Sequence, residues 1–200
     1  RDVAPSRGLG DVYKRQAVIV CPEKRQSEIN TKIAEISAEI KREFLETDPM
    51  ILVEVKKTTI VEKELAMTKD SADKVITALL CLPGGIQKMS FQMKGLVQTS
   101  LNLGIMKTER DHVSLSFSVR SSVESEKRAL LDQIACLTKT LGGTVTTNGD
   151  YPAWEYLENS PLRDLMCRIF EEQYGRKPIV EALHAGVECG IFAGKIPELD

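Results

Sequence analysis

The stretch V-Q-T-S-L-N-L-G-I-M-K-T-E-R-D-H-V-S-L-S-F-S-V-R, residues 97–120, contains two runs in which apolar and polar residues alternate. The apolar positions are Val97, Leu101, Leu103 and Ile105 in the first run, and Val113, Leu115, Phe117 and Val119 in the second. A period of two residues is typical of strands with one buried and one exposed face. The pattern predicts an antiparallel hairpin, with its polar connection at residues 107–112.

Arg120 lies on the polar side of this hairpin, at the far end of the second strand. The period places it across from the side chains of Gln98 and Ser100. An arginine in this position is either a solvated surface charge or a clamp for a carboxylate, and the period alone leaves both readings open.

The segments on either side of the hairpin supply helices and further strands. Apolar residues recur at three- and four-residue spacing in 23–45, in a segment that Ser71 can cap and Pro83 ends, and in a segment that begins at Ser122 and ends at Gly142. Short apolar runs at 17–21, 51–55 and 144–147 indicate strands, and 86–93 is a weaker strand candidate. The order predicts an α+β two-layer sandwich whose helices cover one face of an antiparallel sheet and leave the other face polar.

The chain changes character near residue 150. Tyr151-Pro152-Ala153-Trp154 indicates a hinge or boundary, and Trp154, the single Trp, is either a packing anchor or a ligand contact, with packing favoured. Ser160-Pro161 opens a helix that Gly175 ends, and 179–183 follows as a strand. Helix, buried strand and helix in succession are typical of an α/β domain, so residues 151–200 are expected to begin a second domain that breaks off early.

The run V-E-A-L-H-A-G-V-E-C-G at residues 180–190 indicates a strand that turns into a helix. Free N–H groups at such a helix start suit a carboxylate or phosphate, and Gly186 lets a ligand approach the backbone. His184 and Glu188 stand four residues apart, as a metal pair would, but zinc needs three or four ligands. The alternatives are a buried, hydrogen-bonded pair with Cys189 as a small core residue, and an anion site beside which His184 or Glu188 acts in support.

Composition excludes several classes of function. The net charge of -2 provides no basic field for nucleic acid or an anionic membrane, and the longest uncharged run is too short to span a bilayer. The five cysteines are scattered, without a C-x-x-C pair, which predicts reduced core thiols in a cytosolic protein. Residues 1–16 lack periodicity and an apolar signal segment, so they are expected to be a disordered or extraneous leader.

Four blocks of the chain resemble the aminoacyl-histidine dipeptidases, a branch of the dinuclear zinc metallopeptidases. They are G-L-V-Q-T-S-L-N-L-G (95–104), S-V-R-S-S (118–122), G-D-Y-P-A-W (149–154), and L-H-A-G-V-E-C-G-I-F (183–192) followed by K-I-P-E-L-D. They occur in the order of that family. The resemblance implies a fragment that covers most of a lid domain, residues 17–150, and an incomplete C-terminal segment of the zinc-peptidase catalytic domain, residues 151–200.

The resemblance also implies a function for the complete enzyme, which is hydrolysis of dipeptides, typically Xaa-His, by zinc-activated water in the cytoplasm. Two zinc ions would be held by residues outside this chain, which has only His112 and His184 and no His-x-Asp motif. The chain itself would contain no catalytic residue and no metal ligand, and the isolated fragment is predicted to be inactive. Its partners would be the dipeptide and the missing remainder of the catalytic domain, and a homodimer is left open.

Two residues match positions of the family that bind substrate. Arg120 matches an arginine of the lid that holds the C-terminal carboxylate of the dipeptide, and Gly186 matches a backbone contact nearby. His184 and Glu188 are expected only as neighbours that shape the turn around Gly186. The competing reading is a non-catalytic α+β module for ligand binding or dimerisation.

Overall fold

The computed structural model describes residues 15–57, 66–181, 188–196 and 199–200 of the chain. Contacts divide these into two compact units, one made from the described part of 14–68 and one from the described part of 69–200. The first unit contains a short 3-10 helix, η1 (Glu23–Arg25), and α1 (Gln26–Glu43). The predicted helix over 23–45 is therefore confirmed.

The second unit is built on a three-stranded antiparallel sheet in the order β1-β2-β3. Its strands are β1 (Gly85–Met89), β2 (Val97–Thr108) and β3 (Val113–Ser121). The predicted hairpin is β2 and β3, in which Leu101 pairs with Val119 and Leu103 with Phe117. Its connection closes through a hydrogen bond of 2.9 Å from the Glu109 N–H to the His112 carbonyl.

The alternation within β2 reverses near Gly104, which the sequence pattern did not predict. Leu103 pairs with Phe117, but Ile105 pairs with Ser116 and Met106 with Leu115. This register shift is a β-bulge, which inserts one residue into one strand and moves every later side chain to the opposite face. Ile105 was predicted on the apolar face, but it pairs with a serine of the polar face.

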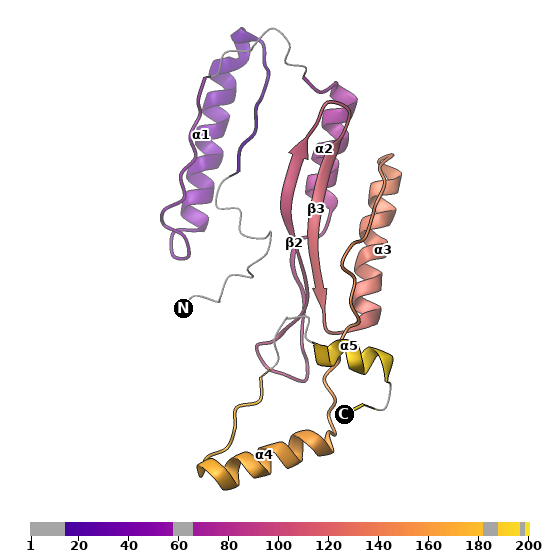
Figure 1. Cartoon of the computed structure of the whole chain (residues 1–200). Coiled ribbons are helices and arrows are strands. Elements are labelled where there is room, and N and C mark those ends of the chain that lie inside the picture. Colours follow the sequence, from indigo (N-terminus) through magenta and orange to yellow (C-terminus); the bar gives the residue numbers. More distant parts are fainter. Residues whose placement is uncertain (1–14, 58–65, 182–187, 197–198) are drawn as a thin grey trace. The chain divides into compact units, whose positions relative to one another are not determined.

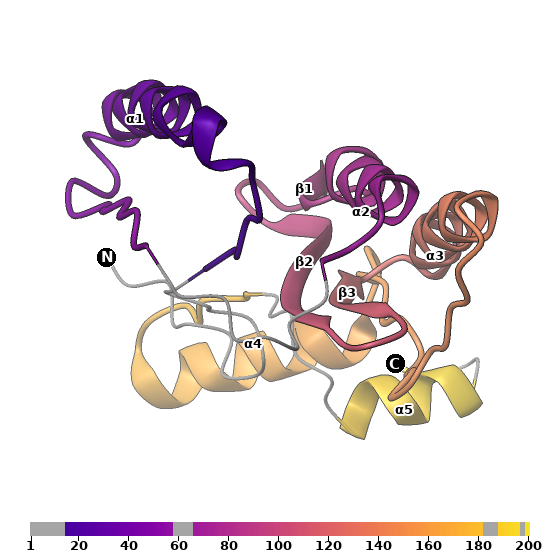
Figure 2. The ribbon, with the colours of Figure 1, turned by 90° about the horizontal axis from the view of Figure 1, so that it is seen from above.

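Two helices pack on one face of the sheet (Figure 2). They are α2 (Lys69–Cys81) and α3 (Glu124–Thr140). The small core consists of Leu101 from β2 and Leu130 and Ile134 from α3, with Leu82, Phe117 and Val119 packed against it. The observed fold is therefore the predicted α+β class, with helices on one sheet face.

Four segments expected as strands are not strands in the described residues. Residues 17–21, 51–55, 144–147 and 179–181 are extended or irregular and pair with no neighbour. An apolar run becomes a strand only when a partner supplies its backbone hydrogen bonds, and local pattern does not reveal the partner. Residues 182 and 183, the end of the last of these segments, lie outside the described residues.

The remaining helices are α4 (Pro161–Tyr174) and α5 (Glu188–Lys195). The predicted boundaries of α4 are confirmed, because the Ser160 side chain accepts a hydrogen bond from the Arg163 N–H and Gly175 ends the helix at φ 64°. Two other predicted caps are wrong. Ser71 lies inside α2, which begins at Lys69, and α3 is preceded by Val123 rather than by Ser122.

Candidate substrate-binding face and its supports

Arg120 projects from β3 on the side of the sheet that faces away from α2 and α3. It pairs directly with Ser100 of β2, while the adjacent Val119 packs against the core. Since successive side chains of a strand point to opposite faces, the Arg120 side chain and the core lie on opposite sides of the sheet. The polar neighbours on its face are Ser100 and the cross-strand pair Asn102 and Ser118, as the period predicted.

The end of β3 that carries Arg120 leads directly into the start of α3 (Figure 1). Ser121 joins the two: its hydroxyl accepts a hydrogen bond from the Val123 N–H at 3.1 Å and lies 2.8 Å from the Thr99 hydroxyl. Thr99 is only 3% exposed. This end of the hairpin is therefore held by buried polar contacts, which fix the backbone beside Arg120.

Glu126, in the first turn of α3, is the centre of these contacts. Its carboxylate binds the Lys88 ammonium of β1 and the Thr99 hydroxyl of β2, and it accepts a hydrogen bond of 2.8 Å from the Gln98 amide. Burial raises the pKa of the Glu126 carboxyl, but the hydrogen bonds from Gln98, Lys88 and Thr99 outweigh burial and leave the pKa below its ordinary value. The carboxylate also lies at the positive end of the helix dipole.

Lys127, the next residue of α3, binds the chain segment that follows this helix. This lysine is only 8% exposed. Its ammonium donates to the Asp150 carboxylate at 2.7 Å and to the Tyr151 carbonyl at 2.7 Å, and it lies 3.0 Å from the Glu124 carboxylate. Burial lowers the pKa of the Lys127 ammonium, but the two carboxylates outweigh burial and raise it above its ordinary value.

The sequence analysis predicted neither Glu126 nor Lys127 as a structural contact, although a signal for Lys127 was present. Lys127, Leu130 and Ile134 are spaced at i, i+3 and i+7, so the lysine lies on the apolar stripe of its own helix. A charged residue on such a stripe must find partners of opposite charge, and here they are Glu124 and Asp150.

The segment that leads into α5 contains two of the predicted residues, His184 and Gly186, and both lie outside the described residues. Glu188 begins α5 and is exposed, and Cys189 is exposed as well. The reading of Glu188 and Cys189 as buried residues is therefore wrong. The prediction that Arg120 and Gly186 bind one substrate stays a prediction.

Trp154 lies against α5, as a packing residue would. A Cβ added at Gly190 would be 3.3 Å from the Trp154 Cβ, and one added at Gly194 would be 2.6 Å from the Pro152 Cβ. Trp154 is nevertheless 52% exposed. The small residues of α5 thus allow the chain at residues 152–154 to approach the helix closely.

The cysteines were predicted to be core residues, and this is wrong. All five are free, none is buried, and Cys81, Cys136 and Cys189 are exposed.

The described residues do not fit a zinc site. Within residues 15–57, 66–181, 188–196 and 199–200, no three His, Cys, Asp or Glu side chains gather as ligands for a metal ion. His112 pairs instead with its neighbour Asp111, whose hydrogen bond raises the pKa of the imidazole. No chemical step through zinc can be derived from the described part of this chain.

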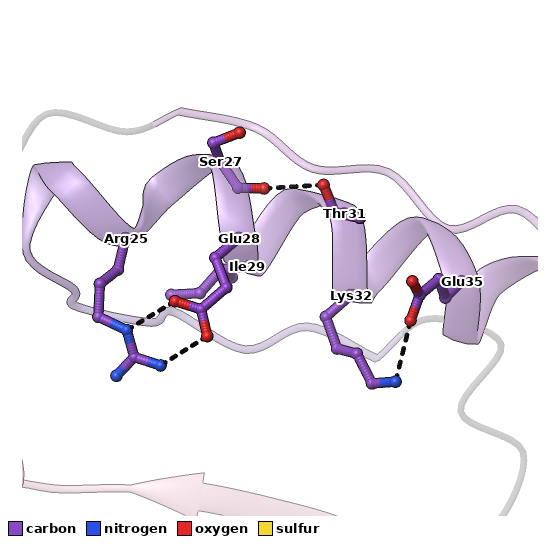
Figure 3. Close-up of a pocket in the computed structure, with 7 residues that line it drawn as sticks. All are labelled: Arg25, Ser27, Glu28, Ile29, Thr31, Lys32 and Glu35. Atoms are coloured by element: carbon purple, nitrogen blue, oxygen red, sulfur yellow. Dashed lines mark hydrogen bonds and ion pairs between the residues drawn. The ribbon is translucent and has the colours of Figure 1, made fainter.

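A hollow on the surface of the described residues does not form a site either. It lies on the surface of α1 and is lined by Arg25, Ser27, Glu28, Ile29, Thr31, Lys32 and Glu35 (Figure 3). Its charged residues pair with one another along the helix, Arg25 with Glu28 and Lys32 with Glu35, each at 2.9 Å. Such exposed pairs are typical of a solvated helix surface.

Comparison with known proteins defines the class of the protein. No protein-family model matches the chain. The chain is similar to the cytosol non-specific dipeptidase of Escherichia coli (strain K12), at 30% identity over 142 residues, which cover 71% of this chain and 29% of that protein. It also matches the crystal structure of aminoacylhistidine dipeptidase from Vibrio alginolyticus with a TM-score of 0.80 and 25% identity, over 86% of this chain and 35% of that one. Over the matched residues, the fold and the sequence are therefore similar to part of these two dipeptidases.

More specifically, over the matched residues the chain belongs to the family of these dipeptidases, which confirms the resemblance seen in its motifs. The chain spans about a third of the length of the two relatives.

In the described part of the chain, none of the helices is both long enough and apolar enough to cross a membrane.

Proposed function

We propose that this chain is part of a dipeptidase and that it supplies the surface that holds the carboxylate end of a dipeptide. The observation that carries the proposal is the position of Arg120, on the polar sheet face of a fold that matches an aminoacylhistidine dipeptidase. Both similar proteins are dipeptidases, so neither favours a non-catalytic ligand-binding or dimerisation module.

In the proposed division of the molecule, residues 17–150 form a lid and residues 151–200 contribute to the catalytic domain. Arg120 would receive the substrate carboxylate, because a planar guanidinium donates two parallel hydrogen bonds to a carboxylate. Gly186 would allow the peptide backbone to approach, and His184 and Glu188 would shape the turn around it. The remainder of the catalytic domain would complete the site.

Zinc, implied by the family, would supply the activated water for hydrolysis from ligands outside the described part of this chain. The role of the chain is then to bind and orient. Holding the substrate by its end limits its length to a dipeptide and places the peptide bond at a fixed distance from the clamp. A cytoplasmic location belongs to the same proposal.

The test is Arg120→Ala in the enzyme that contains this segment together with its metal site. We expect kcat/KM to fall about 100-fold for a dipeptide with a free carboxylate, because truncation removes a charge-assisted pair. With the C-terminal amide of the same dipeptide, the loss should be about threefold or less, since the amide carries no charge.

The matched control is Arg110→Ala, in the exposed connection between β2 and β3. This variant should hydrolyse both substrates at the rate of the wild type. Equal losses for acid and amide in Arg120→Ala would remove the clamp from the account.

A further inference from the structure

Residues 150–154, termed here the strap, follow α3 in the sequence. In space the strap lies between the first turn of α3 and α5. On one side the strap is bound by α3: Asp150 and the Tyr151 carbonyl contact Lys127, and the Ala153 N–H donates to the Glu124 carboxylate at 3.2 Å. Two charged residues one turn apart on α3 thus hold three residues of the strap, Asp150, Tyr151 and Ala153.

On its other side the strap lies against α5. The side chains of Pro152 and Trp154 contact Gly194 and Gly190 respectively. The strap therefore contacts α3 through the Asp150 side chain and the backbone of Tyr151 and Ala153, and it contacts α5 through the side chains of Pro152 and Trp154. Only glycine permits this approach at Gly194, where a Cβ would be 2.6 and 2.7 Å from the proline ring.

The same turn of α3 also carries Glu126, which binds Lys88, Gln98 and Thr99 of the sheet. Consecutive residues of one helix therefore face two directions, Glu126 toward the sheet and Lys127 toward the strap. The described contacts form a continuous series from the sheet beside Arg120 through α3 and the strap to α5.

We infer that Lys127 is a positioning residue that couples the placement of α5 to the sheet carrying Arg120. Its ammonium is the one group that contacts Glu124 of α3, Asp150 and the Tyr151 carbonyl together among the described residues. Loss of the ammonium removes the cation that Asp150 and the Tyr151 carbonyl share, and it leaves Glu124 with the exposed Arg128 at 3.6 Å. The strap then loses these two contacts with α3. α5 then loses the surface on which Gly190 and Gly194 rest.

This inference goes beyond the proposed function and does not depend on it, because its test measures backbone exchange and tryptophan quenching instead of hydrolysis. The experiment is amide hydrogen exchange on the 200-residue chain with Lys127→Met. We expect the amides of α5 to exchange about tenfold faster than in the wild type, while those of β2 and β3 around Leu101 stay within about twofold. Trp154, the single Trp, should become more accessible to acrylamide in the same variant.

Three further variants separate coupling from a general loss of stability. Lys127→Arg keeps the charge and should restore most of the protection of α5. Arg128→Met removes a neighbouring cation whose side chain is 70% exposed, and it should leave α5 unchanged. Asp150→Ala alters an exposed side chain outside the helix and should raise α5 exchange about threefold, so the coupling can be measured even if Lys127→Met fails to fold.

Unchanged α5 exchange in Asp150→Ala and in a folded Lys127→Met would overturn the inference. Equal acceleration of α5 and of the sheet in both variants would overturn it as well, because that result describes a stabilising lysine without a coupling role.

Discussion

Glu126 is the residue on which the geometry beside Arg120 depends most. Its side chain is 20% exposed and has partners on β1 and β2. Replacing a half-buried carboxylate that accepts several hydrogen bonds leaves the partners unsatisfied, including an ammonium. We expect Glu126→Gln to lower the free energy of unfolding by about 1–3 kcal/mol at pH 7, measured by urea denaturation.

The same residue gives stability a pH dependence of known sign. The pKa of the Glu126 carboxyl is lower in the folded chain than its ordinary value of 4.5, so the ionised form favours folding. This contribution is complete above the ordinary pKa and is lost as the pH falls through the folded pKa. Wild-type stability should therefore decline below about pH 5, and the decline should be shallower in Glu126→Gln.

Glu172→Gln is the matched control for both effects. Glu172 forms an exposed pair with Arg168 at 3.9 Å, with both side chains 68% exposed. An exposed pair of this kind contributes little to stability. If Glu172→Gln matched Glu126→Gln in either measurement, the special role of Glu126 would be wrong.

Among the helices, α4 has well-defined ends although none of its residues is buried. Its residues Leu162, Leu165, Met166 and Ile169 are all more than 40% exposed. Its limits are set by Ser160, which is 6% exposed, and by Gly175 in the left-handed conformation. The Asp200 carboxylate adds a contact of 2.7 Å to the Leu162 N–H.

We therefore expect Ser160→Ala to loosen α4 specifically. Loss of a serine cap costs about 1 kcal/mol, which corresponds to a rise of about fivefold in the exchange of amides in the first turns of α4. Hydrogen exchange should show no change in α3. Ser125→Ala is the control, because Ser125 lies inside the first turn of α3 rather than at its cap. A uniform rise across both helices in Ser160→Ala would contradict the prediction.

The sequence pattern predicted elements well where their own residues determine them. The hairpin of β2 and β3, the helix α1 and both ends of α4 follow from local period or cap chemistry. The strands expected at residues 51–55 and 144–147 require a partner from elsewhere, which no local pattern specifies. The bulge at Gly104 was missed for a similar reason, because register depends on the neighbouring strand.

The candidate site was predicted in part. Period alone placed Arg120 opposite Ser100, and the structure confirms that pairing. Its role depends on family resemblance, since a charge on an open sheet face has no distinctive pattern. Lys127 could have been found from its position on an apolar stripe, but its partner Asp150 is 23 residues away and only the fold brings the two together.

At the scale of the whole molecule, binding and hydrolysis are expected to be separable. The described residues contain no cluster of zinc ligands, and the chain has two histidines in all. Zinc sites require three or four ligands. After the 200-residue chain has been dialysed against a zinc solution and the free metal removed, we therefore expect its zinc content to be well below one ion per chain. The chain should hydrolyse dipeptides no faster than a control treated with EDTA. Metal content near one ion per chain, or hydrolysis that EDTA abolishes, would show that a site is present.

A crystal structure of the substrate complex would show directly whether Arg120 holds the carboxylate of the substrate. The crystal would contain the enzyme with this segment and a non-hydrolysable dipeptide analogue. We expect two guanidinium N–H groups of Arg120 to donate to the oxygens of the C-terminal carboxylate, at N–O distances of about 2.7–2.9 Å. A carboxylate bound by other residues, with Arg120 directed into solvent in the closed enzyme, would contradict it.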